Sequence, residues 1–287
     1  MSGVQAFPDL PAARAFVLER AALLDPHSRY VAELLSALDA SASVADLERR
    51  LLAGCRGQRH AGPEVFARMT LAEKLLANLI TAETTLFRFT EGELEALDRE
   101  ILPRLRGRTA RVLIVPCSHG EEAFTMASFL LKSGVDFEIH AFDLQPALIA
   151  EARTGELTFG FPREYLAQPG RVSAEVLSRI RFEVGDAFDL PLPAPLEGEG
   201  RRASHASARS EGLPVPHQFD VVLCRNFLGY FVPEKVLELT GKLAARVAPG
   251  GVLFLDSFCL LKFSAIQREL NARHAHRVGE RPVFLFR

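Results

Sequence analysis

Residues 111–143 read RVLIVPCSHGEEAFTMASFLLKSGVDFEIHAFD, and their pattern sets the fold class. The run RVLIVPC is short, apolar and β-branched, which is typical of a strand buried on both faces. An amphipathic pattern from about Glu121 to Lys132 predicts a helix, and FEIHAFD predicts a second strand. A strand, a helix and a strand in this order are typical of the βαβ unit of a parallel sheet.

The same alternation continues toward the C-terminal end. Further strands are expected at IRFEV, FDVVLC and VLFLDS, and helices at PALIAEAR and PEKVLELTGKLAARV. We expect Pro249-Gly250-Gly251 to close the second of these helices, and PVFLFR to form an edge strand. Residues 108–287 are therefore predicted to be an α/β domain, a doubly wound and mostly parallel sheet with helices on both faces.

Residues 1–107 carry helical patterns instead. Apolar residues recur at helical spacing on both sides of a break at Asp25-Pro26. Three capping signatures mark expected helix starts: Ser43 with Asp46, Thr70 with Glu73, and Thr90 with Glu93. We therefore expect a helical N-terminal domain, with a linker helix, in front of the α/β domain.

The composition excludes several classes of protein. The chain has 287 residues, 34 basic and 36 acidic side chains and 48% hydrophobic residues, the ordinary balance of a globular protein. It excludes a disordered chain, and it excludes a nucleic-acid binder that works by bulk positive charge. Signal-peptide and membrane-span patterns are missing, so a cytoplasmic location without membrane insertion is expected. The four cysteines form no metal or disulfide pattern, and no metal is expected.

Residues 191–217 form a segment of low complexity between two predicted strands, PLPAPLEGEGRRASHASARSEGLPVPH. A loop of this length is uncommon in a compact domain. We interpret it as a flexible surface insertion, with a specific binding loop as the alternative.

Polar residues follow the predicted strands at the edge where open α/β sheets bind ligands. Glu121 and Glu122 follow the first strand, Asp143 ends the second, and Asp186 and Asn226 follow the third and fourth. S-adenosylmethionine (SAM) carries a sulfonium and an ammonium group, which an acidic first loop suits. Asp143 is placed to accept hydrogen bonds from ribose hydroxyls.

Each of these residues also has a purely structural interpretation. Glu121 and Glu122 are favoured in the first turn of any helix by its dipole, and Asp143 and Asp186 are common capping and turn residues. A nicotinamide cofactor is disfavoured, because the first loop lacks the GxGxxG fingerprint and its acidic pair would repel a pyrophosphate.

Four motifs resemble those of the CheR family, the chemotaxis receptor glutamate methyltransferases. ETTLFR at 83–88 resembles the family's NETxFFR, and CSHGEEAF at 117–124 resembles CSTGEEPY. AFDLQPALIAEARTG at 141–155 resembles ATDIDxxxLxxAxxG, and CRNFLGYF at 224–231 resembles CRNxxIYF. The motifs also occur in the family's order and spacing.

The resemblance implies a SAM-dependent O-methyltransferase of the class I fold, with S-adenosylhomocysteine as product, acting on an acidic helical receptor or signalling protein. It implies SAM contacts at Thr84, Arg88, Glu122, Asp143, Asp186, Ala187, Asn226 and Phe227. It also places Arg88 and Tyr230 beside the transferred methyl group as the catalytic pair, with orienting roles.

The chain departs from the family pattern at several positions. Ala82 stands where the family has Asn, His119 where it has Thr, and Gln145 where it has Asp. Two alternatives therefore stay open: a SAM-dependent methyltransferase with another acceptor, and a SAM-sensing or scaffold module with weakened catalysis. A basic excess between Arg49 and Arg68 is compatible with an acidic partner, or with an ordinary solvated face.

Overall fold

The structure is a computed structural model that describes residues 7–54, 63–80, 91–156, 171–190, 218–255, 264–278 and 283–286. None of the described helices is both long and apolar enough to span a bilayer. The expected insertion at 191–217 and the expected cap at Thr90 lie outside these residues.

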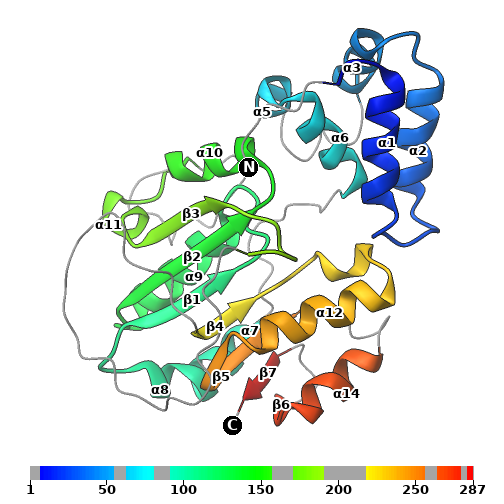
Figure 1. Ribbon diagram of the computed structural model, residues 1–287. Coiled ribbons are helices and arrows are strands. Elements are labelled where there is room, and N and C mark those ends of the chain that lie inside the picture. Colours follow the sequence, from blue (N-terminus) through cyan, green and yellow to red (C-terminus); the bar gives the residue numbers. More distant parts are fainter. Residues whose placement is uncertain are drawn as a thin grey trace.

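A seven-stranded sheet forms the centre of the described chain, in the order β3-β2-β1-β4-β5-β7-β6 (Figure 1). The strands are β1 (Ala110–Ile114), β2 (Phe137–Asp143), β3 (Ile180–Val184), β4 (Phe219–Leu223), β5 (Val247–Phe254), β6 (Ala275–Arg277) and β7 (Val283–Phe286). The first five pair in parallel, and β7 runs antiparallel to β5 and β6. The predicted doubly wound, mostly parallel fold is confirmed.

Helices cover both faces of this sheet. They are α9 (Glu121–Lys132), α10 (Pro146–Thr154), α11 (Ala174–Leu177), α12 (Pro233–Ala244) and α14 (Ser264–Ala272). Buried side chains alternate between two apolar clusters. Leu113 of β1 joins one cluster, and its neighbours Val112 and Ile114 join the other. Both faces of β1 are therefore covered from Val112 to Ile114, where its sequence is apolar, and Arg111 near the start of the strand is exposed.

The N-terminal region is helical, as predicted. It contains α1 (Leu10–Ala21), α2 (Arg29–Asp39), α3 (Val44–Leu52), α5 (Pro63–Arg68) and α6 (Leu71–Leu79), which lie together in Figure 1. A linker follows as α7 (Glu91–Ala96), the π-helical turn η1 (Leu97–Ile101) and α8 (Leu102–Leu105). Ser43 accepts a hydrogen bond from the Asp46 amide, and Thr70 and Glu73 form a full capping box.

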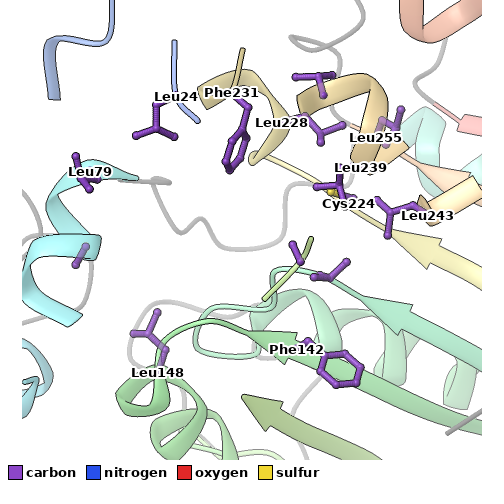
Figure 2. Close-up of a cluster of buried hydrophobic side chains, with 14 of the residues drawn as sticks. Leu24, Leu79, Phe142, Leu148, Cys224, Leu228, Phe231, Leu239, Leu243 and Leu255 are labelled. Carbon is purple, nitrogen blue, oxygen red and sulfur yellow. The ribbon is translucent and has the colours of Figure 1, made fainter. Parts of the chain in front are cut away.

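One apolar cluster joins these helices to the sheet. It includes Leu24 beside α1, Leu79 of α6, Phe142 of β2 and Phe231 after β4 (Figure 2). The backbone adds to this contact, because the Asp25 amide donates to the Tyr230 carbonyl at 2.8 Å. The α1–α2 connection is therefore packed directly on the segment that follows β4.

Two predictions about the C-terminal part were wrong. PVFLFR does not form the sheet edge, because Ala275–Arg277 pairs beyond it as β6. Pro249-Gly250-Gly251 does not close a helix. The helix α12 ends at Ala244, and these three residues lie within β5, with Gly250 at a φ of 78°.

Candidate functional site

A cavity lies at the carboxyl ends of β1, β2, β3 and β4, where the topology of an open α/β sheet places ligands. The connections after each of these strands contribute to its wall, and residues from α1 and α6 close the opposite side. Leu24, Leu79, Leu148 and Phe231 are four of its apolar lining residues (Figure 2). The cavity therefore lies between the sheet edge and the N-terminal helices.

The connection after β1 turns sharply into α9. Ser118 has a φ of 50° and Gly120 a φ of 92°, so two left-handed residues lie within three positions. A Cβ on Gly120 would lie 3.0 Å from the rings of Phe124 and Phe182, so a side chain there would require these rings to shift by a few tenths of an ångström. Gly120 is the N-cap residue of α9 and, because glycine has no side chain, it makes no capping hydrogen bond. This tight turn brings Ser118 and His119 onto the cavity wall.

Asp143 ends β2 and organises this edge of the sheet. Its Oδ2 accepts from the Ser118 amide at 2.9 Å, and its Oδ1 accepts from the Gln145 amide at 3.0 Å. The side chain is buried, and burial raises its pKa from 3.8 to about 6 despite these hydrogen bonds. Each oxygen keeps a second lone pair, so the carboxylate can still accept from a ligand hydroxyl.

Asp186 and Ala187 follow β3 and line the same cavity. Asp186 accepts from the Phe188 amide at 2.9 Å through Oδ1, and its Oδ2 lies 3.8 Å from the Arg20 guanidinium of α1. Arg20 also lines the cavity. A cation from the N-terminal helices therefore faces an acid from the sheet edge across this part of the wall.

The connection after β4 holds a buried ion network. Arg225 lies 3.2 Å from Glu122 of α9 and 3.4 Å from Glu93 of α7, and the side chains of Arg225 and Glu93 are 5% and 3% exposed. Glu93 and Glu122 both face the Arg225 guanidinium. These ion pairs connect the linker helix α7, the helix α9 and the segment that follows β4. Sequence reasoning did not assign Arg225 or Glu93. Both stand in the quoted or capping motifs, but their pairing depends on residues 132 positions apart.

The two glutamates at the start of α9 have different surroundings. Burial raises the pKa of Glu121 from 4.5 to about 7. Glu122 faces Arg225, which balances its charge. Glu122 does not line the cavity described above. The negative charge expected from Glu121 and Glu122 is therefore reduced. The carboxylates on the cavity wall are those of Asp143 and Asp186.

Other predicted site residues can be placed as follows. Phe227 lines the cavity, whereas Asn226 does not, and Asn226 adopts a φ of 54°. Tyr230 ends the short helix η3 (Leu228–Tyr230), and its half-buried ring lies 6.1 Å from that of Tyr30 in α2. Thr84 and Arg88 lie outside the described residues.

Comparisons with known proteins show which proteins this chain is similar to. Residues 82–196 match the family described as CheR methyltransferase, SAM binding domain. The chain is 33% identical to the "Chemotaxis protein methyltransferase" of Listeria monocytogenes over 186 residues, 62% of this chain and 65% of the relative. It is 28% identical over 200 residues to the "Probable biofilm formation methyltransferase WspC" of Pseudomonas aeruginosa, 64% of this chain and 43% of the relative. The matched part spans less than two thirds of either relative.

Solved structures of methyltransferases are also similar, at a lower level. Magnesium protoporphyrin IX methyltransferase from Synechocystis is 14% identical, with a TM-score of 0.38, over 68% of this chain and 80% of that one. The amino pentose methyltransferase CalS10 from Micromonospora echinaspora is 23% identical, with a TM-score of 0.32, over 57% of this chain and 49% of that one.

The strand order is that of a class I methyltransferase-like α/β sheet, and residues 82–196 match the SAM-binding domain of CheR methyltransferases. Over this part the chain is similar to CheR-type methyltransferases at modest identity, and SAM is the cofactor of the matched domain.

The residues around the cavity fit this cofactor. Carboxylate acceptors at Asp143 and Asp186 suit ribose hydroxyls, an adenine amino group and positive charge. Apolar side chains such as Leu144, Phe188 and Phe231 provide the surface that a purine ring requires. Acceptors and apolar surface together match a nucleoside better than they match a phosphate.

Proposed function

We propose that this chain transfers the methyl group of SAM to glutamate carboxylates of a chemoreceptor-like signalling protein. The match of residues 82–196 to the SAM-binding domain of CheR methyltransferases carries the proposal, and relatives named chemotaxis protein methyltransferase support it. The acceptor we propose is an acidic helical segment of such a protein in the cytoplasm. Nucleic acid and membrane insertion have no part in this proposal.

The proposed cofactor contacts come from the strand ends. Asp143 holds the ribose, while Asp186 and the backbone of Ala187 contact the adenine. Thr84, Arg88, Glu122, Asn226 and Phe227 complete the proposed set of cofactor contacts. When bound, SAM supplies a methyl group activated by its sulfonium. Support for the assignments of Asp143, Asp186 and Ala187 comes from their places on one cavity wall.

A glutamate side chain needs little activation for this reaction. Its usual pKa is ~4.3, so at neutral pH it is already an anionic nucleophile. A general base is not required, and the chain contributes mainly by alignment. We assign Arg88 and Tyr230 to orient the acceptor carboxylate. A donor that held the carboxylate too tightly in the ground state would weaken it as a nucleophile.

The test is transfer of a labelled methyl group to a purified acidic helical receptor segment. The expected product is a base-labile methyl ester, which is absent when every acceptor glutamate is replaced by alanine. Because Arg88 is one of several proposed cofactor contacts, Arg88→Ala is expected to bind the cofactor more weakly and, at saturating cofactor, to lower kcat at least tenfold. Transfer to other side chains but not to glutamate would overturn the proposal.

A second candidate is a SAM-binding module without transferase activity. The departures at Ala82, His119 and Gln145 favour it, and two of these residues, His119 and Gln145, line the cavity. The same assay separates the two candidates, because such a module would bind the cofactor and form no methyl ester on any acceptor.

A further inference from the structure

The backbone around Tyr230 is held by the turn between α1 and α2. The Asp25 amide donates to the Tyr230 carbonyl at 2.8 Å. The Val232 amide donates to the Leu23 carbonyl at 3.1 Å. These two hydrogen bonds lie on either side of Phe231 and make a short antiparallel bridge. The segment that carries Tyr230 is therefore tied to the N-terminal helices rather than to its own sheet alone.

The turn between α1 and α2 is closed by hydrogen bonds of its own. Asp25 Oδ1 accepts from the His27 amide at 2.9 Å, and the Asp25 carbonyl accepts from the Ser28 amide at 2.9 Å. Pro26 lies inside the turn and fixes one of its backbone torsions. Leu24, just before the turn, is 3% exposed and packs in the apolar cluster that joins the helices to the sheet (Figure 2). A turn closed and anchored in this way can hold the segment after β4 firmly.

Tyr30, in the first turn of α2, contacts the side chain of Tyr230. The two ring centroids are 6.1 Å apart and the ring planes are tilted by 47°, inside the range of about 4.5–7 Å that aromatic pairs prefer. Both side chains are half-buried. The guanidinium of Arg29 lies 5.3 Å from the centroid of the Tyr30 ring, which adds a cation–π contact to the pair. The Tyr30 ring therefore restricts the directions in which the Tyr230 ring can point.

A tyrosine that orients a substrate has to be held itself. In the proposed reaction the Tyr230 hydroxyl aligns the acceptor carboxylate, and a displacement of about 1 Å can cost about a hundredfold in rate. Tyr30 does not line the cofactor cavity, so its contact with Tyr230 bears on the acceptor side of the site. The helical region and the sheet domain thus share one orienting side chain.

We propose that Tyr30 is a positioning residue for methyl transfer, because its ring fixes the Tyr230 ring, while the turn at Asp25 fixes the Tyr230 backbone. This inference rests on the proposed function for the role of Tyr230. It gives the N-terminal helices a part in the chemical step, in addition to closing one side of the cofactor cavity.

The first experiment is methyl transfer by the full chain to the acidic receptor segment at saturating SAM. Tyr30→Ala is expected to lower kcat at least about fivefold, with the acceptor KM and the affinity for S-adenosylhomocysteine within about twofold of wild type. Tyr30→Phe keeps the ring and is expected to keep kcat within about twofold of wild type. Leu35→Ala is the matched control, because it removes another half-buried side chain from α2, and its kcat should equal that of wild type.

A double variant separates positioning from general loss of packing. Tyr30→Ala is expected to cause no further loss of kcat in the Tyr230→Phe background, because the hydroxyl that Tyr30 positions is already missing. Melting temperatures check that each variant is folded, and a lower melting temperature in Leu35→Ala with full kcat would show that packing alone does not set the rate.

The second experiment needs no acceptor and uses the small number of tyrosines. The chain has three, Tyr30, Tyr165 and Tyr230, and no tryptophan. NMR relaxation of 13C-labelled tyrosine rings can therefore follow Tyr230 alone, once its signal has been identified by its loss in Tyr230→Phe. The order parameter of the Tyr230 ring should fall in Tyr30→Ala and stay unchanged in Leu35→Ala. A change in ring current alone would move the signal without lowering the order parameter.

Several results would overturn the inference. They are a kcat of Tyr30→Ala equal to that of wild type, an equal loss of kcat in Leu35→Ala, a change confined to the acceptor KM, and a full further loss in the Tyr230→Phe background. An unchanged order parameter of the Tyr230 ring in Tyr30→Ala would overturn it without any acceptor. Failure of the wild-type chain to form a methyl ester would instead contradict the proposed function, so the two failures are distinguishable.

Discussion

Nη1 of Arg225 lies 3.2 Å from Oε1 of Glu122, and this contact joins the segment after β4 to the first turn of α9. The other terminal nitrogen of Arg225 lies 3.4 Å from Glu93 in the linker helix. Three elements that are distant in the sequence therefore meet at one buried guanidinium. The two strand-end segments of the proposed site are thus fixed relative to each other by charge as well as by packing.

Replacement of Arg225 by methionine is expected to destabilise the chain strongly. The change removes the cation that faces the buried Glu93 and the partly buried Glu122, and loss of one partner from a buried ion pair costs about 3–5 kcal/mol. Urea denaturation would measure the change. Arg99→Met is the control, because Arg99 is exposed and its ion pair with Glu100 is expected to contribute less than about 1 kcal/mol. Equal effects of the two substitutions would contradict a buried network.

Cofactor affinity is expected to depend on pH through Asp143. Its pKa of about 6 in the folded chain means that the carboxylate is protonated as the pH falls below 6. The protonated group loses acceptor capacity for the ribose, so affinity should be highest above pH 7 and should fall as the pH is lowered through 6. Binding of S-adenosylhomocysteine between pH 5 and pH 8 measures this. Asp143→Asn should bind S-adenosylhomocysteine at least tenfold more weakly and lack this pH dependence. A wild-type affinity that does not change between pH 5 and pH 8 would contradict the role of Asp143 as the ribose acceptor.

Glu121 is expected to reduce stability at high pH. Its pKa is about 7 in the folded chain and near 4.5 in the unfolded chain, because burial disfavours the ionised form. The folded state therefore binds more protons between these pH values, and stability falls as the pH rises through 7. Glu121→Gln removes this penalty and should stabilise the chain at pH 8 by up to about 3 kcal/mol, with little effect at pH 4. Denaturation at the two pH values measures the difference, and an equal effect at both would contradict the assigned pKa.

A side chain at Gly120 is expected to destabilise the chain. Gly120→Ala places a Cβ at a φ of 92° and 3.0 Å from two aromatic rings, so both backbone strain and ring displacement oppose it. Gly134→Ala is a matched control, because Gly134 has a φ of 68° but open space around its Cβ. The control should cost about 1–2 kcal/mol from the backbone alone. Gly120→Ala should cost more and should also weaken cofactor binding, whereas equal thermal shifts would show that the rings yield freely.

Much of the fold could be predicted from local patterns. The bounds of β2, β3 and α9 were predicted to the residue, because continuous apolar runs and an amphipathic period leave few alternatives. The short strand β6 was missed because Ala275–Arg277 contains two polar residues and pairs only through the chain's return at β7. Pro249-Gly250-Gly251 was misread because the same residues suit a helix end and an irregular strand start.

The site was predictable only in part. Asp143, Asp186, Ala187 and Phe227 follow strands, so topology alone brings them to one cavity wall. The partners of Arg225 and of the Tyr230 carbonyl could not be predicted, because each comes from a different part of the chain. Pairing of this kind is decided by tertiary packing, and local sequence carries no signal for it.

The central claim is that this chain binds SAM at the cavity formed by the carboxyl ends of its strands. Calorimetric titration of the intact chain with SAM and with S-adenosylhomocysteine tests it most directly. We predict one binding site for each ligand, with affinity lost in Asp143→Ala because two backbone amides and the ribose lose a buried acceptor. Absence of binding by either ligand, or unchanged affinity in Asp143→Ala, would contradict it.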